Sequence, residues 1–260
     1  MGDAVHRVVS LVPSLTETIC DLGVSGRLVG ISRYCLEPIE HLRFVTRVGG
    51  TKNPSLERIA SLDPDLILVN SEENREEDIA WMKERFETFE CMPKTVVEAS
   101  DAVRDLGDRL GLDSEAHAIL LEIEANLLRA DVMSLDRGFV RVFYPIWKQP
   151  WIGVNRDTYI SDVLTRAGAV NVCGQRESRY PVVPQQAVID LRPDLVLLPS
   201  EPFAFSPEHR RQLLDKAVFG KNVPILMVDG KNFCWHGSRS GRGFGAVIDL
   251  LAPFRKRLVA

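Results

Sequence analysis

Residues 59–72 read IASLDPDLILVNSE, and residues 188–201 read VIDLRPDLVLLPSE. Both stretches carry Pro, Asp, Leu, Ser and Glu at the same places, and each describes a helix end, a Pro-Asp turn, an apolar strand and a polar strand exit. The two stretches stand about half a chain length apart in the 260-residue sequence. The sequence therefore predicts a duplicated molecule of two similar lobes with a cleft between them.

Short apolar runs alternate with helical periodicity in both halves, a pattern typical of α/β proteins with a parallel sheet. The expected strands cover residues 7–11, 27–31, 66–69 and 88–92 in the first half, and 140–144, 195–198 and 224–228 in the second. The expected helices cover residues 16–22, 56–62 and 76–86, then 159–167, 207–216 and 244–251. We expect two Rossmann-like lobes, each built on a parallel sheet.

Residues 113–134, DSEAHAILLEIEANLLRADVMS, contain no Gly or Pro and are rich in Ala, Leu and Glu. Asp113 is the expected helix cap, and Glu115 falls in the first turn. At 1.5 Å per residue such a helix is about 30 Å long. We expect one backbone helix, residues 113–136, to join an N-terminal lobe, 1–112, to a C-terminal lobe, 137–260, and to limit domain motion on binding.

Composition excludes several classes of protein. The formal net charge is −4 and no run of Lys and Arg is interleaved with aromatics, which argues against a nucleic-acid partner. The apolar runs have strand length and are too short to span a bilayer. No export signal is visible, so we expect either a cytoplasmic protein or a chain whose signal has been removed. We expect a monomer.

No catalytic motif is present: the sequence lacks GxSxG, GxGxxG, GxxxxGK[ST] and HExxH, and its histidines are dispersed. The five cysteines are scattered, unlike a disulfide framework or a paired CxxC metal site. We therefore expect a binding protein and not an enzyme, with no resident cofactor and no metal site.

The opening RVVSLVPSLTETICDLGVSGRLVGIS, the segment VGGTKNPSLERIASLDPDLIL and the repeat VIDLRPDLVLL resemble, in order and spacing, the helical-backbone (class III) substrate-binding proteins of iron-complex and cobalamin ABC importers. GISRYC, residues 30–35, is similar to the first-lobe aromatic loop of the cobalamin-binding members. One departure is that Thr51 and Lys52 stand where those members have a tryptophan before the Asn-Leu-Glu helix start.

The resemblance implies an ABC transporter permease as partner, contacted by one glutamate on each lobe. Glu76 matches this position in the first lobe, and Glu208 is a looser candidate in the second. Acidic residues are also favoured in a first helical turn by the helix dipole, which is the plain alternative for both.

Ligands of open parallel sheets bind outside the carboxyl ends of the strands, so the residues after each expected strand are candidate contacts. Aromatic candidates for the walls of the site are Tyr34, Trp147, Trp151, Tyr180, Phe203 and Trp235. Polar candidates are Arg33, Lys52, Glu72, Arg179 and His236. Rings suit a large flat ligand. We expect a cobalamin-like corrinoid or another metal chelate in the interlobe cleft, bound for ABC-type uptake.

Several alternatives stay open. The rings can instead pack as core at the sheet ends. Arg33, Arg179, Arg239 and Arg242 favour an anionic ferric siderophore or haem, unless they pair with Glu73 or Glu177 or lie on the surface. A tetrapyrrole chelatase would need His236 with Glu72 or Glu201, and a bare metal ion would draw on these with Cys35 and Cys234. A cytosolic corrinoid sensor or carrier is a further class.

Overall fold

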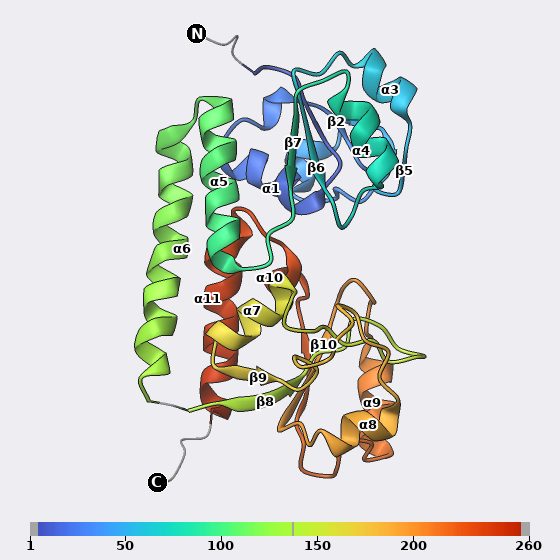
Figure 1. Cartoon of the computed structure of the whole chain (residues 1–260), viewed down its shortest axis with the longest axis vertical. Helices are drawn as coiled ribbons and strands as arrows, with labels where there is room; N and C mark the ends of the chain where they lie inside the picture. The colour runs from blue at the N-terminus through green and yellow to red at the C-terminus, as the bar shows by residue number, and fades with distance from the viewer. Residues whose placement is uncertain (1–4, 137, 256–260) are drawn as a thin grey trace. The chain divides into compact units, whose positions relative to one another are not determined.

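The computed structural model describes residues 5–136 and 138–255, which divide into two compact units, shown in Figure 1. Unit 1 contains residues 5–93, Val97–Glu122 and His236–Ser240. Unit 2 contains Lys94–Val96, Ile123–Trp235 and residues 241–255. The predicted second lobe begins at residue 137, which lies outside the described residues, as do 1–4 and 256–260. The lobe boundaries 1–112 and 137–260 stay a prediction.

Unit 1 is built on a five-stranded sheet of order β3-β2-β1-β6-β7, in which all neighbouring strands are parallel. Its strands are β1 (Val8–Ser10), β2 (Leu28–Ile31), β3 (Thr46–Arg47), β6 (Leu66–Asn70) and β7 (Thr88–Cys91). β4 (Gly49–Gly50) and β5 (Asn53–Pro54) form a separate antiparallel pair. β1 and β6 are buried throughout, as expected for central strands of a covered parallel sheet.

Helices cover both faces of this sheet (Figure 1). They are α1 (Pro13–Asp21), the 3-10 turn Ser25–Arg27, α2 (Ile39–Leu42), α3 (Leu56–Ser61), α4 (Glu76–Lys83) and α5 (Val96–Leu110). Ile59 of α3 and Met82 of α4 join Val9, Ile67 and Val69 in one core cluster, so α3 and α4 pack on the face that these strand residues present. α5 was missed from the sequence.

Unit 2 has a four-stranded parallel sheet of order β11-β10-β8-β9. Its strands are β8 (Val140–Phe143), β9 (Ala169–Asn171), β10 (Leu195–Pro199) and β11 (Ile225–Val228). Its helices are α7 (Tyr159–Arg166), α8 (Gln185–Asp190), α9 (Pro207–Asp215), α10 (Lys231–Cys234), α11 (Arg239–Leu251) and the 3-10 turn Ala252–Phe254. Val188 and Leu213 pack with Phe143 and Val196 in its core. α9 begins with a capping box at Ser206.

The sequence repeat forms the same anchor in each unit. In unit 1 the carboxylate of Asp65 accepts a hydrogen bond from the backbone N of Arg7 at 2.8 Å, and the Arg7 Nε donates to the carbonyl of Asp63 at 3.0 Å. In unit 2 Asp194 accepts from the backbone N of Arg141 at 3.1 Å, and the Arg141 Nε donates to the carbonyl of Arg192 at 3.2 Å.

The backbone conformation repeats as well. Asp63 and Arg192, which follow α3 and α8, both have positive φ, 43° and 49°. The Pro-Asp turn is therefore closed in the same way before β6 and before β10, as the duplicated sequence predicts.

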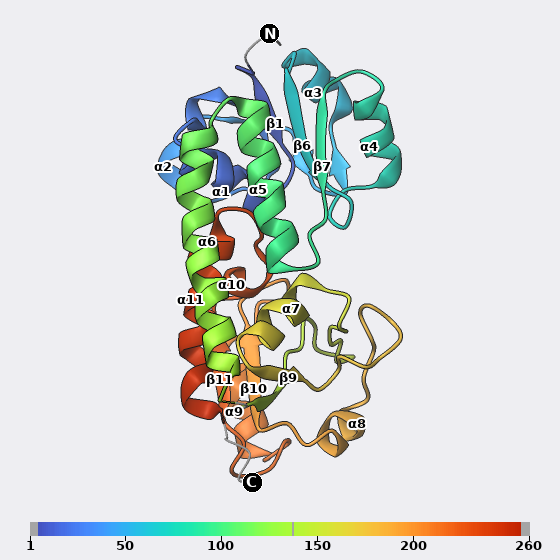
Figure 2. The same ribbon diagram turned by 60° about the vertical axis from the view of Figure 1, so that its left-hand side comes forward.

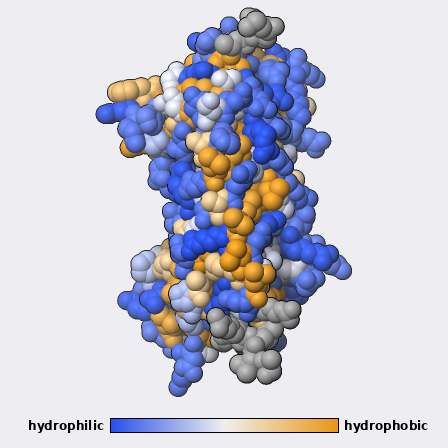
Figure 3. Space-filling model, turned by 90° about the vertical axis from the view of Figure 1, so that its left-hand side faces the viewer, coloured by the Kyte–Doolittle hydropathy of each residue, from blue (hydrophilic) through white to orange (hydrophobic). Residues whose placement is uncertain are grey.

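α6 spans Asp113–Ser134, the residues predicted for the long helix, and lies beside α5 in Figures 1 and 2. Because the helix begins at Asp113, that residue lies in its first turn and is not its cap. Leu121, Leu128 and Val132 are more than half exposed, and Figure 3 shows apolar side chains gathered on the face that carries α6. Within the described residues no helix combines the length and the apolar character needed to cross a membrane.

The sequence predicts the last helix across residues 244–251, with SGRGFG, residues 240–245, as its N-terminal turn. α11 begins at Arg239, one residue before that turn, and includes all of it.

Candidate functional site

Polar residues end the central strands of unit 1 at the carboxyl edge of its sheet. Ser10 closes β1, Ser32 follows β2 and Asn70 closes β6, and all three are buried. Because the strands are parallel, these ends meet at one edge. Buried polar groups require hydrogen-bond partners, so the loops above them are fixed from below.

Asn70 organises the loop after β6. Its Oδ1 accepts from the backbone N of Glu72 at 2.7 Å and of Glu73 at 3.2 Å, while its own backbone N donates to Asn74 Oδ1 at 2.9 Å. The Lys52 Nζ donates to the carbonyl of Glu72 at 2.7 Å. Two predicted polar contacts, Lys52 and Glu72, are thus brought together at this loop, and both side chains are exposed.

Arg33 and Tyr34 lie together after β2. The guanidinium carbon of Arg33 stands 5.1 Å from the centre of the Tyr34 ring, and the ring is 51% exposed. A cation over an aromatic face is attractive, which holds the pair as one unit. An exposed ring beside an exposed guanidinium can contact a ligand that has both a flat face and an anionic group.

Cys35 has a structural role. Its Sγ lies 3.0 Å from Thr16 Oγ1 and 3.2 Å from Ser32 Oγ, and the residue is fully buried. Burial raises the pKa of this thiol above its ordinary value, so it stays protonated and is a poor metal ligand. In residues 5–136 and 138–255 no group of three or more His, Cys, Asp or Glu side chains is placed to hold a metal ion.

The segment His236–Ser240 belongs to unit 1 and packs against α1. His236 is 5% exposed, and its Nε2 lies 3.0 Å from Asn70 Nδ2 and 3.5 Å from Ser14 Oγ. Desolvation lowers the pKa of His236 to about 4. The imidazole is therefore neutral at physiological pH and is engaged inside the unit.

Arg239, proposed from sequence as a ligand contact or a partner of Glu73 or Glu177, forms a bidentate ion pair with Glu17 of α1. Arg239 Nε donates to Glu17 Oε2 at 2.8 Å, its Nη2 donates to Glu17 Oε1, and the two side chains are only 14% and 6% exposed. This pair fastens the start of α11 to α1 and is not part of an open site.

The aromatic loops of unit 2 divide into exposed and buried rings. Trp147 is 45% exposed and packs edge-on against Phe203, with ring centres 5.1 Å apart. Trp151 is 6% exposed and packs between Phe143 and Phe205 in the core. Its burial argues for packing and against ligand contact, whereas Trp147 and Phe203 offer an accessible face.

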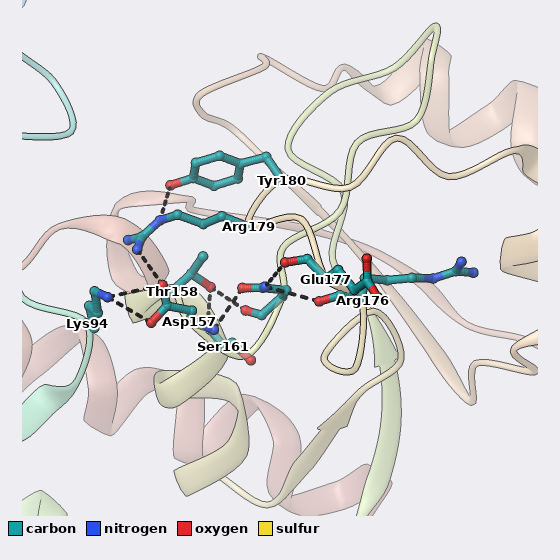
Figure 4. Close-up of polar contacts among 9 residues, drawn as sticks. Lys94, Asp157, Thr158, Ser161, Arg176, Glu177, Arg179 and Tyr180 are labelled. Carbon is teal, nitrogen blue, oxygen red and sulfur yellow. Dashed lines mark hydrogen bonds and ion pairs between the residues drawn. The ribbon is translucent and has the colours of Figure 1, made fainter.

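Arg179 and Tyr180 form the second cation–ring pair, with 5.8 Å between the guanidinium carbon and the ring centre. Figure 4 shows Arg179 directed to Asp157, whose Oδ2 lies 3.1 Å from Arg179 Nη1. The Lys94 Nζ binds both oxygens of the same carboxylate, at 2.9 and 3.1 Å. Lys94 and Arg179 together lower the pKa of Asp157, so it is charged at all ordinary pH values.

Glu201 supports Trp235. The Glu201 carboxylate accepts hydrogen bonds from Cys234 Sγ, at 3.4 Å, and from the Trp235 side chain. The Lys231 Nζ stands 5.3 Å from the centre of the Trp235 ring. Burial raises the pKa of Glu201 despite these contacts. The ring of Trp235 is therefore held by its neighbours in one orientation.

Cys234 ends helix α10, so the strand that would bring Cys234 and His236 onto one face is absent at these residues. The two proposed docking glutamates are both exposed: Glu76 opens α4, and Glu208 lies in the first turn of α9, where it pairs with Arg211. The Glu208 Oε1 also accepts from Gln212 Nε2 at 3.0 Å.

A cavity of about 350 Å³ opens elsewhere in unit 2, with Lys148, Trp151, Gln212 and Lys216 among its lining residues. Of the predicted ligand contacts, only Trp151 borders it.

Sequence reasoning missed Asn70, Glu17 and Asp157. Asn70 ends an otherwise apolar run, the one local signal that it carries. Glu17 and Asp157 find their arginine partners 222 and 22 residues later in the chain, so no local pattern reveals them.

Three comparisons place the chain among known proteins. A family model described as periplasmic binding protein matches residues 8–203. The vitamin B12-binding protein of Vibrio cholerae serotype O1 is 24% identical over 192 residues, which cover 74% of this chain and 69% of that protein.

Among solved structures, the periplasmic vitamin B12-binding protein BtuF of Vibrio cholerae superposes with a TM-score of 0.82 at 20% identity, covering 96% of this chain and 97% of that one. A periplasmic haem-binding protein from Pseudomonas aeruginosa gives 0.80 at 23% identity, covering 98% and 96%. At these identities the likeness shows the fold, and it confirms the predicted two-lobed α/β class.

Proposed function

Because the chain belongs to the periplasmic binding protein family, we propose that it binds a cobalamin-like corrinoid or a related metal chelate for uptake by an ABC-type importer. The family and the relatives that match are substrate-binding proteins, so the chain binds its ligand and does not convert it. The chelatase alternative has no support from them.

The observation that carries this proposal is the exposure of aromatic rings at the carboxyl ends of parallel strands in both units. Tyr34 follows β2 of unit 1, and Trp147 follows β8 of unit 2; they are 51% and 45% exposed. Large aromatics are otherwise mostly buried in proteins. A corrin or porphyrin face that covers such a ring removes on the order of 150 to 250 Å² of it from water.

The proposed ligand class rests on the relatives and on the exposed guanidinium of Arg33. Several relatives are vitamin B12-binding proteins, and several structural neighbours are haem-binding proteins. A flat tetrapyrrole-like chelate is common to both. The exposed guanidinium of Arg33 adds a contact for an anionic group on such a ligand. Because Arg33 can bind an anionic group, an anionic ferric siderophore or haem is the second candidate ligand.

The test is a thermal-unfolding screen with cyanocobalamin, cobinamide, haem and a ferric siderophore. A ligand that binds only the folded chain stabilises it by about 2.7 kcal/mol at a hundredfold excess over Kd. We expect the largest shift with a corrinoid. The proposal is wrong if none of the four raises the melting temperature.

Docking to an importer is proposed for Glu76 and Glu208. Both carboxylates are exposed at the starts of helices, one in each unit, which makes them available to arginines of a permease. Charge reversal, Glu76→Lys with Glu208→Lys, should leave the ligand Kd unchanged and reduce uptake by cells that depend on this chain. Reversal of Glu84, exposed at the other end of α4, serves as the control and should leave uptake unchanged.

A further inference from the structure

The tripeptide Ser-Arg-Tyr occurs once in each unit, at residues 32–34 and 178–180. In both copies the guanidinium lies over the ring of the next tyrosine, at 5.1 Å in unit 1 and 5.8 Å in unit 2. The first copy follows β2 and the second follows β9, and these strands occupy the same place in their sheets, next to β1 and β8 respectively. The two copies therefore stand in equivalent connections of the duplicated fold.

The first copy carries a guanidinium without a carboxylate partner in the described part of the chain. Arg33 Nη2 donates to the amide oxygen Oδ1 of Asn53 at 3.3 Å, and the Arg33 backbone N donates to the carbonyl of Gly49 at 2.7 Å. Gly50 permits this approach, since a Cβ there would stand 2.3 Å from Asn53 Oδ1 and 2.9 Å from Arg33 Nη2. No described carboxylate offsets the positive charge of Arg33, and its side chain is exposed.

The second copy is arranged differently. Arg179 is 23% exposed, binds Asp157 through Nη1 at 3.1 Å and reaches the Tyr180 hydroxyl through Nε at 3.5 Å (Figure 4). Lys94 shares the carboxylate of Asp157. The three charged groups sum to +1, so Asp157 cancels one of two cations that would otherwise face solvent together.

Backbone contacts build this arrangement in advance. Asn155 is 6% exposed; its backbone N donates to the carbonyl of Arg179 at 3.0 Å, and its Oδ1 accepts from the backbone N of Asp157 at 2.8 Å. The Asn155 Nδ2 donates to the carbonyls of Arg176 and Glu177 at 3.1 and 3.3 Å. One buried side chain therefore sets the register between the Asp157 turn and the Arg179 loop, and the ion pair needs no rearrangement to form.

We propose that Asp157 is a specificity-determining residue: by occupying Arg179 it leaves the phenol of Tyr180 as the group that the second copy offers to a chelate, whereas Arg33 in the first copy stays open to an anionic group. This inference rests on the proposed function. A guanidinium already paired with a carboxylate offers fewer donors to a ligand, and the carboxylate repels a second anion. The chain then favours chelates with one anionic edge over polyanionic ones.

A plainer role for Asp157 is to fasten the segment Lys94–Val96 to the rest of unit 2. The Val96 backbone N also donates a hydrogen bond within unit 2, to Asp162 Oδ2 at 2.8 Å. Lys94→Met separates the two roles, because it removes the fastening contact and leaves the Asp157–Arg179 pair in place.

Reciprocal charge variants test the inference. Asp157→Asn frees Arg179, and Asn53→Asp places a carboxylate beside Arg33, converting each unit to the arrangement of the other. Asp101→Asn, which makes the same charge change in an exposed ion pair of α5, is the control. Dissociation constants are measured for haem, which bears propionates, for cobalamin, which bears a phosphate, and for cobinamide, which lacks that phosphate. Melting temperatures verify that every variant is folded.

We expect Asp157→Asn to tighten haem binding about fivefold, and Asn53→Asp to weaken haem and cobalamin binding about fivefold, as for one charge pair near the surface. Cobinamide binding should change less than about twofold in every variant. Lys94→Met and Asp101→Asn should leave the preference between haem and cobinamide unaltered.

If the wild type binds a chelate and Asp157→Asn leaves that preference unchanged, or Lys94→Met shifts it as strongly, the role of Asp157 is structural and the inference is overturned while the proposed function stands. If the wild type binds none of the three, the inference falls, and the proposed function falls with it when the ferric siderophore of the thermal screen also fails to bind.

Discussion

The ring nitrogen Nε2 of His236 lies 3.0 Å from the side-chain nitrogen Nδ2 of Asn70, which stands 166 residues earlier in the chain. An amide nitrogen only donates, so this imidazole nitrogen accepts and the ring is neutral. Burial agrees with that assignment, since it lowers the pKa of His236 to about 4. A charged imidazolium at this place would lose both its hydration and this hydrogen bond.

The free energy of unfolding should therefore fall as the pH is lowered. The unfolded chain binds a proton at His236 near pH 6.5, and the folded chain binds it only near pH 4. The free energy of unfolding is therefore unaffected by His236 above about pH 6.5 and decreases progressively as the pH falls to about 4. The loss is on the order of 3 kcal/mol. Urea unfolding from pH 4 to 7.5 measures it. His236→Gln should flatten this dependence and the exposed His6→Gln should not; equal slopes in wild type and His236→Gln would contradict the prediction.

The Glu17–Arg239 pair should matter far more than an exposed pair. Removing one partner of a buried ion pair leaves an uncompensated charge and costs about 3 to 5 kcal/mol. Glu17→Gln should approach that loss in chemical denaturation, because both side chains are nearly buried. Asp101→Asn breaks the exposed pair with Arg104 and should cost less than about 1 kcal/mol. Comparable losses in the two variants would show that the buried pair is not needed for stability.

Gly237 should tolerate no side chain. Its φ is +86°, and a Cβ there would stand 2.3 Å from the Thr18 Oγ1 that accepts a hydrogen bond from the Ser238 backbone N. Gly111 also has a positive φ, +67°, with no atom within 4 Å of the same position. Gly111→Ala should cost about 1 to 2 kcal/mol from backbone strain alone, and Gly237→Ala about 1 to 3 kcal/mol more from the clash. Thermal unfolding of both variants checks the difference; equal costs would refute the clash.

Two tryptophans in one loop should behave in opposite ways. Trp151→Ala empties a core site and should destabilise the chain by about 3 to 5 kcal/mol. Trp147→Ala removes an exposed ring, so its stability cost should be below about 1 kcal/mol, while chelate binding should weaken about tenfold. Unfolding and titration of both variants decide this. Unchanged ligand affinity in Trp147→Ala would remove that residue from the site.

Much of the fold was predictable because it rests on local patterns. The apolar runs of β6 and β10 and the uninterrupted helix at Asp113–Ser134 follow from period, length and the absence of Gly and Pro. Tertiary contacts support the structure where local propensity is weak. SGRGFG, predicted as the N-terminal turn of the last helix, belongs to α11 despite its three glycines, and Arg239 at the helix start is held by Glu17.

The candidate site also contains residues that local sequence patterns predict and residues whose exposure only tertiary packing decides. Parallel topology is enough to predict that Arg33, Tyr34 and Glu72 follow strand ends, because carboxyl ends of parallel strands share one edge. Lys52 lies instead between β4 and β5 of the antiparallel pair. No pattern in the sequence distinguishes the exposed Trp147 from the buried Trp151, four residues apart, since the packing of Phe143 and Phe205 decides it.

By itself the sequence determined that this chain is a duplicated α/β protein. Hydrophobic periodicity and turn residues act over a few neighbouring positions, so the sequence alone reveals them. Only the tertiary structure decided which charges are open and which are paired. Arg33 and Arg179 occupy identical tripeptides, yet Asp157 takes up the second and no described carboxylate pairs with the first. Electrostatic partners are set by distance in space, which sequence separation does not encode.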